Sequence, residues 1–405
     1  MNILFLTMNI FTDINMHNIY SDLMQRFILG GHKPYIVTPR EKKTGEKTQC
    51  LDFGDYCILK VRVGNLSNVS LIEKGISTVT IENCFKRAID KHLGSVDFDL
   101  ILYSTPPITF SGVVRKMKKK CNAVTYLMLK DIFPQNAVDI GMFSKNGPIY
   151  KYFRSKEKSL YAISDYIGCM SEANVRFLCE NNIGLDKDKI EICPNSITVP
   201  HVPTKVSKEE KSVVRKKYNI PQDKTVFLYG GNLGKPQGID FLIDCLKCER
   251  ENEKAFFVII GSGSEHGKLE EYLKQSRQGN LIVLNALPKT EYDKLTSCCD
   301  VGMIFLDYRF TIPNFPSRVL SYMQAAMPVL CVTDEASDIG DEAETGHFGF
   351  KCPSNSTEEF HKEICKICDL DNIAEYGDNA YSYLCENYNV DVSYNAIVKH
   401  IKKER

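Results

Sequence analysis

Short apolar runs alternate with segments of helical periodicity along almost the whole chain. Strands that alternate with amphipathic helices are typical of βαβ units and parallel sheets. The spacing of the runs predicts two such sheets, one in each half of the chain. The expected strands are 3–8, 35–39, 100–104, 123–128, 166–170 and 190–193 in the first half, and 225–229, 255–260, 281–284, 301–305 and 329–332 in the second.

The chain has 405 residues, more than one hydrophobic core usually serves, so two domains are expected. Residues 197–224 are rich in Pro, Lys and Val without a strong period and are interpreted as a linker region. We therefore expect an N-terminal domain at 1–200 and a C-terminal domain at 220–384. A final helix at 385–405 is expected to pack back on the first domain.

The apolar run at residues 1–7 is too short for a signal peptide and is interpreted as the first strand. No stretch approaches the ~18 apolar residues of a membrane span, so any membrane contact would be peripheral. The 16 cysteines favour reduced thiols and a cytoplasmic location. Two pairs with metal-knuckle spacing, Cys245/Cys248 and Cys365/Cys368, are interpreted as buried helix-face thiols, with zinc ligands as the alternative, and no metal site is expected.

The formal charge is balanced, but residues 334–391 carry a net charge of −12 and the remainder +12. This distribution disfavours a nucleic-acid-binding protein and permits contact between the basic part and an anionic membrane surface. Residues 115–120 form the densest basic cluster. A solvated helix end is the favoured interpretation of that cluster, and contact with an anionic membrane surface is the alternative.

Two glycine-rich segments follow predicted strands of the second half, at 230–238 and 261–264. Glycine lets the backbone approach a phosphate closely, and Lys235 can add a positive charge. Neither segment is a Walker loop or a full G-x-G-x-x-G, and each alone could be a tight turn without a ligand. Together they indicate a nucleotide site. Its expected residues are Gly231, Asn232, Gly234, Lys235, Gly261, Ser262 and Gly263.

Three segments of the second half, 231–238, 257–263 and 315–330, resemble in order and spacing the family-four glycosyltransferases of bacterial surface-polysaccharide assembly. The resemblance implies α/β architecture of the GT-B type, with two Rossmann-like, doubly wound parallel-sheet domains facing a cleft. It also implies a nucleotide-sugar in the C-terminal domain, no required metal ion, and retention of anomeric configuration. It adds four residues to the expected donor site, namely Pro316, Ser317, Arg318 and Ser321.

The first half matches a narrower branch, because residues 129–141 resemble a segment of fucosamine-type transferases. Residues 168–171 and 193–196 resemble strand ends that line the cleft of the family.

The chain also departs from the family pattern. The paired glutamates of the family would fall on Pro313 and Ser321, so both carboxylates are missing. The Arg and Lys that flank the glycine loop would align with Asn232 and Gln237, which leaves Lys235 and Arg318 as the available cations. The loop after the first strand lacks the usual Gly-Gly.

Sugar transfer needs stabilisation of the departing diphosphate, for which Lys235 and Arg318 are the candidates. The alternative for either is a surface ion pair. Asp131 follows a predicted strand and is the candidate base for the acceptor hydroxyl. Asp131 could equally cap the next helix or turn.

We therefore expect a metal-independent transferase with no cofactor, whose donor is a UDP-sugar. Its expected acceptor is a polyprenyl-diphosphate-linked glycan at the inner face of the membrane, in capsule, O-antigen or exopolysaccharide synthesis. Two alternatives stay open. The loss of both glutamates suits a non-catalytic partner of another transferase, and an epimerase of the same fold would need paired carboxylates that the loops do not offer.

Overall fold

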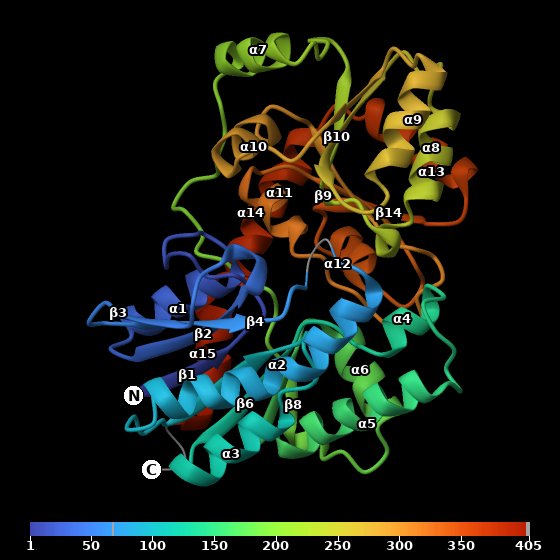
Figure 1. Ribbon diagram of the computed structural model, residues 1–405. Coiled ribbons are helices and arrows are strands. Elements are labelled where there is room, and N and C mark those ends of the chain that lie inside the picture. Colours follow the sequence, from blue (N-terminus) through green and yellow to red (C-terminus); the bar gives the residue numbers. More distant parts are fainter. Residues whose placement is uncertain (67–68, 402–405) are drawn as a thin grey trace. The chain divides into compact units, whose positions relative to one another are not determined.

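The computed structural model describes residues 1–66 and 69–401 (Figure 1). The chain divides into two compact units, Met1–Thr198 with Asn389–Arg405, and Val199–Tyr388. Within the described ranges, every helix is too short or too polar to span a bilayer.

The first unit is built on an eight-stranded sheet of order β3-β4-β2-β1-β5-β6-β7-β8. All neighbouring strands are parallel except β3 and β4, which form an antiparallel pair at one edge. The strands are β1 (Asn2–Leu6), β2 (Lys33–Glu41), β3 (Gln49–Asp52), β4 (Cys57–Val63), β5 (Leu100–Ser104), β6 (Val124–Leu129), β7 (Tyr166–Cys169) and β8 (Ile190–Ile192). The helices are α1 (Ile19–Leu29), α2 (Leu71–His92), α3 (Ser111–Cys121), α4 (Gln135–Asp139), α5 (Pro148–Ile163), α6 (Glu172–Asn181) and α15 (Val390–Ile401).

Helix α15 belongs to the first unit although it ends the chain. Tyr394 packs edge-on against Phe27 of α1, with ring centroids 5.3 Å apart. The guanidinium of Arg26 lies 4.1 Å above the Tyr394 ring. Ser393 donates a hydrogen bond to the carbonyl of Pro194 at 2.9 Å. These contacts join the final helix to the sheet through α1 and the segment after β8.

The second unit is built on a six-stranded parallel sheet of order β11-β10-β9-β12-β13-β14. Counted from β9, this is the strand order 3-2-1-4-5-6 of doubly wound nucleotide-binding domains. The strands are β9 (Thr225–Asn232), β10 (Ala255–Ser262), β11 (Leu281–Leu284), β12 (Val301–Phe305), β13 (Val329–Thr333) and β14 (Gly349–Pro353). The helices are α7 (Lys208–Lys217), α8 (Ile239–Cys248), α9 (His266–Ser276), α10 (Lys289–Thr296), α11 (Arg318–Gln324), α12 (Ile339–Thr345), α13 (Thr357–Cys368) and α14 (Ile373–Asn387). The prediction of two parallel α/β sheets is confirmed.

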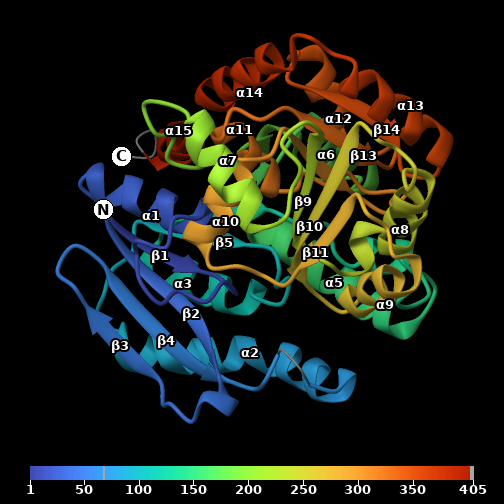
Figure 2. The ribbon, with the colours of Figure 1, turned by 90° about the horizontal axis from the view of Figure 1, so that it is seen from above.

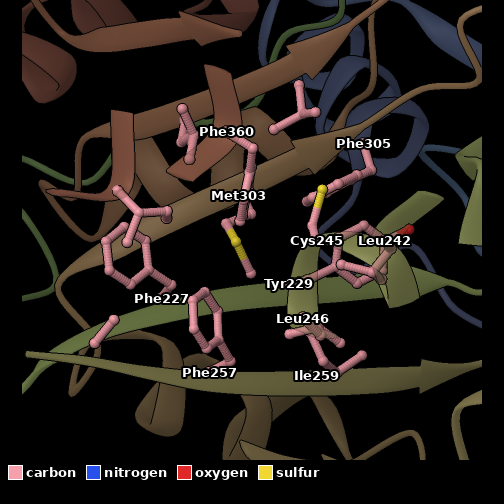
Figure 3. Packing of buried hydrophobic residues seen from close by; sticks show 14 of the residues in the cluster. Phe227, Tyr229, Leu242, Cys245, Leu246, Phe257, Ile259, Met303, Phe305 and Phe360 are labelled. Atoms are coloured by element: carbon pink, nitrogen blue, oxygen red, sulfur yellow. The ribbon is translucent and has the colours of Figure 1, made fainter. Parts of the chain in front are cut away.

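Buried aromatic and aliphatic side chains fill the space between this sheet and α8 (Figure 3). Phe227 and Phe257 on neighbouring strands stack with ring centroids 5.5 Å apart. Helices α8 and α9 pack side by side, and α13 packs against α8 (Figure 2). The core fixes the strand ends, from which the loops described below emerge.

The linker interpretation of residues 197–224 is wrong in part, because this stretch contains α7. Ser207 and Glu210 form a capping box at its start. Arg215 is buried and forms an ion pair with Asp300 at 2.6 Å. Hydrophobic periodicity is weak in α7 because Val214 is its one buried apolar residue, and the ion pairs of Lys211 and Arg215 with Asp300 join the helix to the second unit.

Candidate functional site

The candidate donor site lies where β9 and β12 separate. Their ladder joins only Phe227 to Val301 and Leu228 to Gly302. Beyond it, the Tyr322 hydroxyl accepts a hydrogen bond from Gly230 N–H at 2.9 Å and donates one to the Met303 carbonyl at 3.3 Å. Ligands of open α/β sheets bind outside the carboxyl ends of the strands at such a switch point.

Arg318, the first residue of α11, supplies a positive charge at this point. Its guanidinium carbon lies 4.6 Å from the ring centroid of Tyr229, and its Nη1 is buried without a hydrogen-bond partner. A Cβ on Gly231 would lie 3.4 Å from the same carbon. None of the ion pairs among the described residues involves Arg318, so the surface ion-pair alternative finds no support there. A half-buried cation without a carboxylate partner suits an anionic ligand.

Three tyrosines surround this guanidinium, and the sequence analysis did not identify them. Burial raises the pKa of Tyr229, Tyr292 and Tyr322, so none of the phenols supplies a negative charge at neutral pH. A Cβ on Gly230 would overlap the Tyr292 hydroxyl, and a Cβ on Gly302 would overlap the Tyr322 ring. In the sequence, the only hint of Tyr292 and Tyr322 is a glycine in each of two strands, β9 and β12. A side chain at either glycine would occupy the space of a tyrosine that comes from a helix.

The first glycine loop is shaped by its own hydrogen bonds. Gly231 has φ +134°, which favours glycine. The Gln237 side-chain carbonyl accepts hydrogen bonds from Asn232 Nδ2 at 3.0 Å and from Gly234 N–H at 3.2 Å. Lys235 begins a 3₁₀ turn, and its side chain is exposed. Its charge is therefore free to move toward a ligand.

The second glycine loop packs directly on the first. Gly261 pairs with Gly231 in the β9–β10 ladder. A Cβ on Gly261 would overlap the Gly231 carbonyl oxygen, and one on Gly263 would overlap the backbone of Leu233. Close packing of two turns thus explains both glycines, while Ser262 stays exposed at the end of β10. A role for Gly261, Ser262 and Gly263 in nucleotide binding stays a prediction.

The loop that leads to Arg318 is held from β13. Asn314 N–H donates to Ser337 Oγ at 2.9 Å, and Ser337 Oγ donates to Asp334 at 3.0 Å. Burial raises the pKa of Asp334 to about 6. Residues of the same loop already donate hydrogen bonds to the Asp334 carboxylate. Asp334 therefore does not replace the carboxylates missing at Pro313 and Ser321.

The remaining predicted donor residues lie along the start of α11. The Pro316 carbonyl accepts a hydrogen bond from Val319 N–H at 3.2 Å. Ser317 precedes the helix without capping it and is exposed, and Ser321 is half-buried one turn later. Their roles stay predictions.

Asp131 follows β6 in the first unit. Asp131 N–H donates to Thr105 Oγ1 at 3.1 Å, and Asn136 Nδ2 donates to the Asp131 carboxylate at 2.8 Å. Burial raises the pKa of Asp131 to about 6. Pro134 occupies the N-cap of α4, so Asp131 is not the helix cap. It is a partly buried carboxylate whose proton affinity suits a base near neutral pH.

The basic cluster at 115–120 lies on α3 and is largely paired. Lys116 forms an ion pair with Asp90, and Lys118 forms one with Asp165 at 2.5 Å. Lys120 donates to the Gly94 carbonyl. These contacts favour a helix end tied to neighbouring elements.

Comparison with protein families gives a match over residues 210–382 to "Glycosyl transferases group 1". The probable glycosyltransferase WbjE of Pseudomonas aeruginosa is 24% identical over 297 residues, which cover 73% of this chain and 72% of that protein. The putative colanic acid biosynthesis glycosyl transferase WcaI of Escherichia coli K12 is 23% identical over 252 residues, covering 61% of this chain and 60% of that protein.

Solved structures share the fold along the whole chain. Sucrose-phosphate synthase from Thermosynechococcus elongatus has a TM-score of 0.76 at 14% identity, covering 100% of this chain and 99% of that one. HepE from Anabaena, in complex with UDP and glucose, has a TM-score of 0.71 at 14% identity and covers 100% of both chains. The family model thus matches residues 210–382 of the second unit, and the solved structures show that the fold of the chain is the GT-B fold.

Proposed function

We propose that this chain transfers a sugar from a nucleotide-sugar donor, with retention of configuration, to a lipid-linked glycan in surface-polysaccharide synthesis. The observation that carries the proposal is the half-buried Arg318, whose buried Nη1 has no hydrogen-bond partner and whose guanidinium lies beside Gly231 at the switch point. A diphosphate would supply the missing negative charge.

UDP is the proposed nucleotide. HepE was solved with UDP and glucose, and another structural neighbour, a trehalose-6-phosphate protein from E. coli, was solved with UDP-2-fluoro glucose. Each has a TM-score above 0.7 to this chain. The polysaccharide role is supported by the likeness to WcaI, whose name refers to colanic acid biosynthesis. A fucosamine-type sugar stays a proposal from sequence resemblance.

The proposed chemistry follows from the charges of Arg318, Lys235 and Asp131. As the glycosidic bond breaks, negative charge grows on the leaving diphosphate, where Arg318 and the mobile cation of Lys235 stabilise it. Two cations make a metal ion unnecessary in this proposal. The acceptor hydroxyl gives its proton either to the departing phosphate or to Asp131, which is ionised above about pH 6.

A membrane-borne acceptor is supported by a surface near Asp131 rather than by α3. Residues 140–156 contain four basic and no acidic residues, and Met142, Ile149 and Tyr152 are exposed there. Phe133, two residues after Asp131, packs against Phe143 and Phe153 of this segment. Apolar side chains among lysines suit an anionic lipid surface.

A thermal-shift screen with UDP, GDP, ADP and their common sugar derivatives tests the donor proposal. Stabilisation by UDP compounds, reduced in Lys235→Ala, supports it. Stabilisation by another nucleotide would replace uracil as the proposed nucleobase of the donor. No stabilisation by any nucleotide would favour the second candidate, a non-catalytic partner of another transferase, which the residues at Pro313 and Ser321 motivate.

A further inference from the structure

Two cysteine side chains contact each other on the antiparallel hairpin at one edge of the first unit's sheet. Cys50 lies on β3 and Cys57 begins β4, and their Sγ atoms are 3.2 Å apart. β3 is the outermost strand of this sheet and pairs with β4 (Figure 2). Both cysteines are free, so the contact joins two thiols.

The register of the hairpin places the two thiols on one face. Cys50 pairs with Leu59, two residues after Cys57, so Cys50 and Cys57 are diagonal neighbours in the ladder. Side chains two residues apart on a strand point to the same face, and diagonal neighbours of a twisted antiparallel pair lie within reach of each other. The Phe53 N–H donates to the Tyr56 carbonyl at 2.9 Å, and this short turn fixes the register.

The two thiols differ in their access to solvent. Cys57 is 2% exposed and Cys50 is half-buried, so an oxidant in solution reaches Cys50 first. Burial raises the pKa of Cys57, the hydrogen bond and charge of Cys50 raise it further, and the charge of Lys33 lowers it. Once Cys50 is bonded to another sulfur it carries no negative charge, so its contribution to the raised pKa disappears. Cys57 is then the thiol placed to attack Cys50.

We propose that Cys50 and Cys57 are a redox-active pair, which a low-molecular-weight disulfide such as glutathione disulfide converts into a bridge across the β3–β4 hairpin. A disulfide bond is about 2.05 Å long, so the two sulfurs must approach each other by about 1.2 Å. Because β3 is the outermost strand, it can make this movement without displacing another strand. The inference does not depend on the proposed transfer reaction.

The bridge forms in two steps of thiol–disulfide exchange. The Cys50 thiolate attacks one sulfur of glutathione disulfide, whose S–S bond breaks, and one glutathione leaves and takes up the proton that Cys50 lost. The Cys57 sulfur then attacks Cys50, the mixed disulfide breaks, and the second glutathione leaves with the proton of Cys57. Two protein thiols are thus oxidised to one disulfide, and one glutathione disulfide is reduced to two thiols. An excess of reduced glutathione reverses both steps.

The bridge would join the edge strand covalently to its neighbour. An edge strand is hydrogen-bonded on one side and opens more readily than a central strand. Amide hydrogen exchange of β3 should therefore be slower in the oxidised protein than in the reduced protein. Disulfides of reducing compartments are usually transient and redox-sensing, which suits a reversible bridge between two thiols.

A single tryptic peptide reports the state of the pair. Trypsin cleaves after Lys47 and Lys60, and residues 48–60 contain both cysteines and no internal Lys or Arg. The full-length reduced protein is incubated with glutathione disulfide under native conditions, unfolded in acid, alkylated and digested. In wild type this peptide should lose about 2 Da and take up no alkyl group, and dithiothreitol should restore both alkylation sites.

Three variants separate the steps. Cys57→Ala should accumulate a glutathione adduct on Cys50, because the second thiol is missing, and Cys50→Ser should leave the buried Cys57 without an adduct. Cys84→Ser, which changes a half-buried cysteine on α2 of the same unit, is the matched control and should form the bridge like wild type.

Two results would overturn the proposal. In one, the wild-type peptide takes up two alkyl groups after treatment with glutathione disulfide. In the other, it keeps a glutathione adduct on Cys50 and never loses the two hydrogens. Wild type alone decides between these results and the bridge, so the test does not depend on the folding of a variant.

Discussion

The guanidinium carbon of Arg318 lies 4.6 Å from the ring centroid of Tyr229, at the point where β9 and β12 separate. A tyrosine face attracts a cation without neutralising its charge. Arg318 is thus held in place by a neutral group, and its charge stays available to a ligand.

Lys235→Ala should weaken nucleotide binding without affecting the fold. The Lys235 side chain is exposed on the first glycine loop, so we expect a change within about 0.5 kcal/mol in the free energy of unfolding. Loss of one charged contact to a diphosphate should cost about 1.5 to 3 kcal/mol of binding free energy. Nucleotide titration by calorimetry measures the loss of binding free energy, and urea unfolding measures the change in stability. Wild-type affinity in the variant would remove Lys235 from the site.

Gly261→Ala should destabilise the second unit by about 3 kcal/mol, the upper end for overpacking, because the new methyl group would overlap the backbone carbonyl of Gly231. Gly267→Ala is the matched control, since a Cβ there meets nothing within 4 Å and the position is helical. The control should be stabilised by about 0.5 to 1 kcal/mol. Urea unfolding of both variants checks this, and equal stabilities would contradict the packing of the two loops.

Arg215→Ala should destabilise the protein by about 1.5 to 3 kcal/mol, because Asp300 would lose one of its two cationic partners while Lys211 keeps the other. Lys216→Ala, exposed on the same helix, should change stability by less than about 0.5 kcal/mol. Chemical unfolding compares the two. Similar small effects would show that α7 is not anchored through this pair.

Asp131→Asn should abolish the fall of kcat/KM at low pH. If Asp131 is the base, kcat/KM of wild type falls as the pH drops through about 6, where the carboxylate gains its proton. The variant should lack this limb and be slower by roughly 10²- to 10⁴-fold. Asp55→Asn, exposed in the same unit, is the control. An unchanged profile in Asp131→Asn would assign the proton to the leaving phosphate instead.

The same variant should be more stable than wild type at pH 8. Burial raises the pKa of Asp131 from 3.8 to about 6, so its favourable contribution to stability is complete below pH 3.8 and is lost as the pH rises through 6. Asparagine keeps the uncharged form, and the gain at pH 8 is at most about 3 kcal/mol. The difference in the free energy of unfolding between Asp131→Asn and wild type should be larger at pH 8 than at pH 5. An equal difference at the two pH values would contradict the raised pKa of Asp131.

Much of the fold could be predicted because fully buried parallel strands are continuous apolar runs. Among the described strands, β3, β4 and β14 were missed. β3 is an exposed edge strand, β4 has its apolar residues interrupted by Lys60 and Arg62, and β14 begins with glycine and ends with proline. β3 and β14 owe their place to pairing with β4 and β13, which sequence periodicity does not report.

The donor site was predicted only where glycines or the family resemblance marked it. Gly231 and Arg318 lie far apart in sequence, yet the structure brings them into contact. The Tyr292 and Tyr322 side chains reach the same point from two helices, and no local pattern relates them.

Calorimetric titration of UDP into wild type, Arg318→Ala and Arg250→Ala tests the central claim most directly. Arg250 is exposed beside Glu251 and serves as the control. We expect one site in wild type and in Arg250→Ala, and at least a tenfold loss of affinity in Arg318→Ala, as removal of a charged hydrogen bond implies. Equal affinity for UDP in wild type and Arg318→Ala would contradict the assignment of Arg318 to the donor diphosphate.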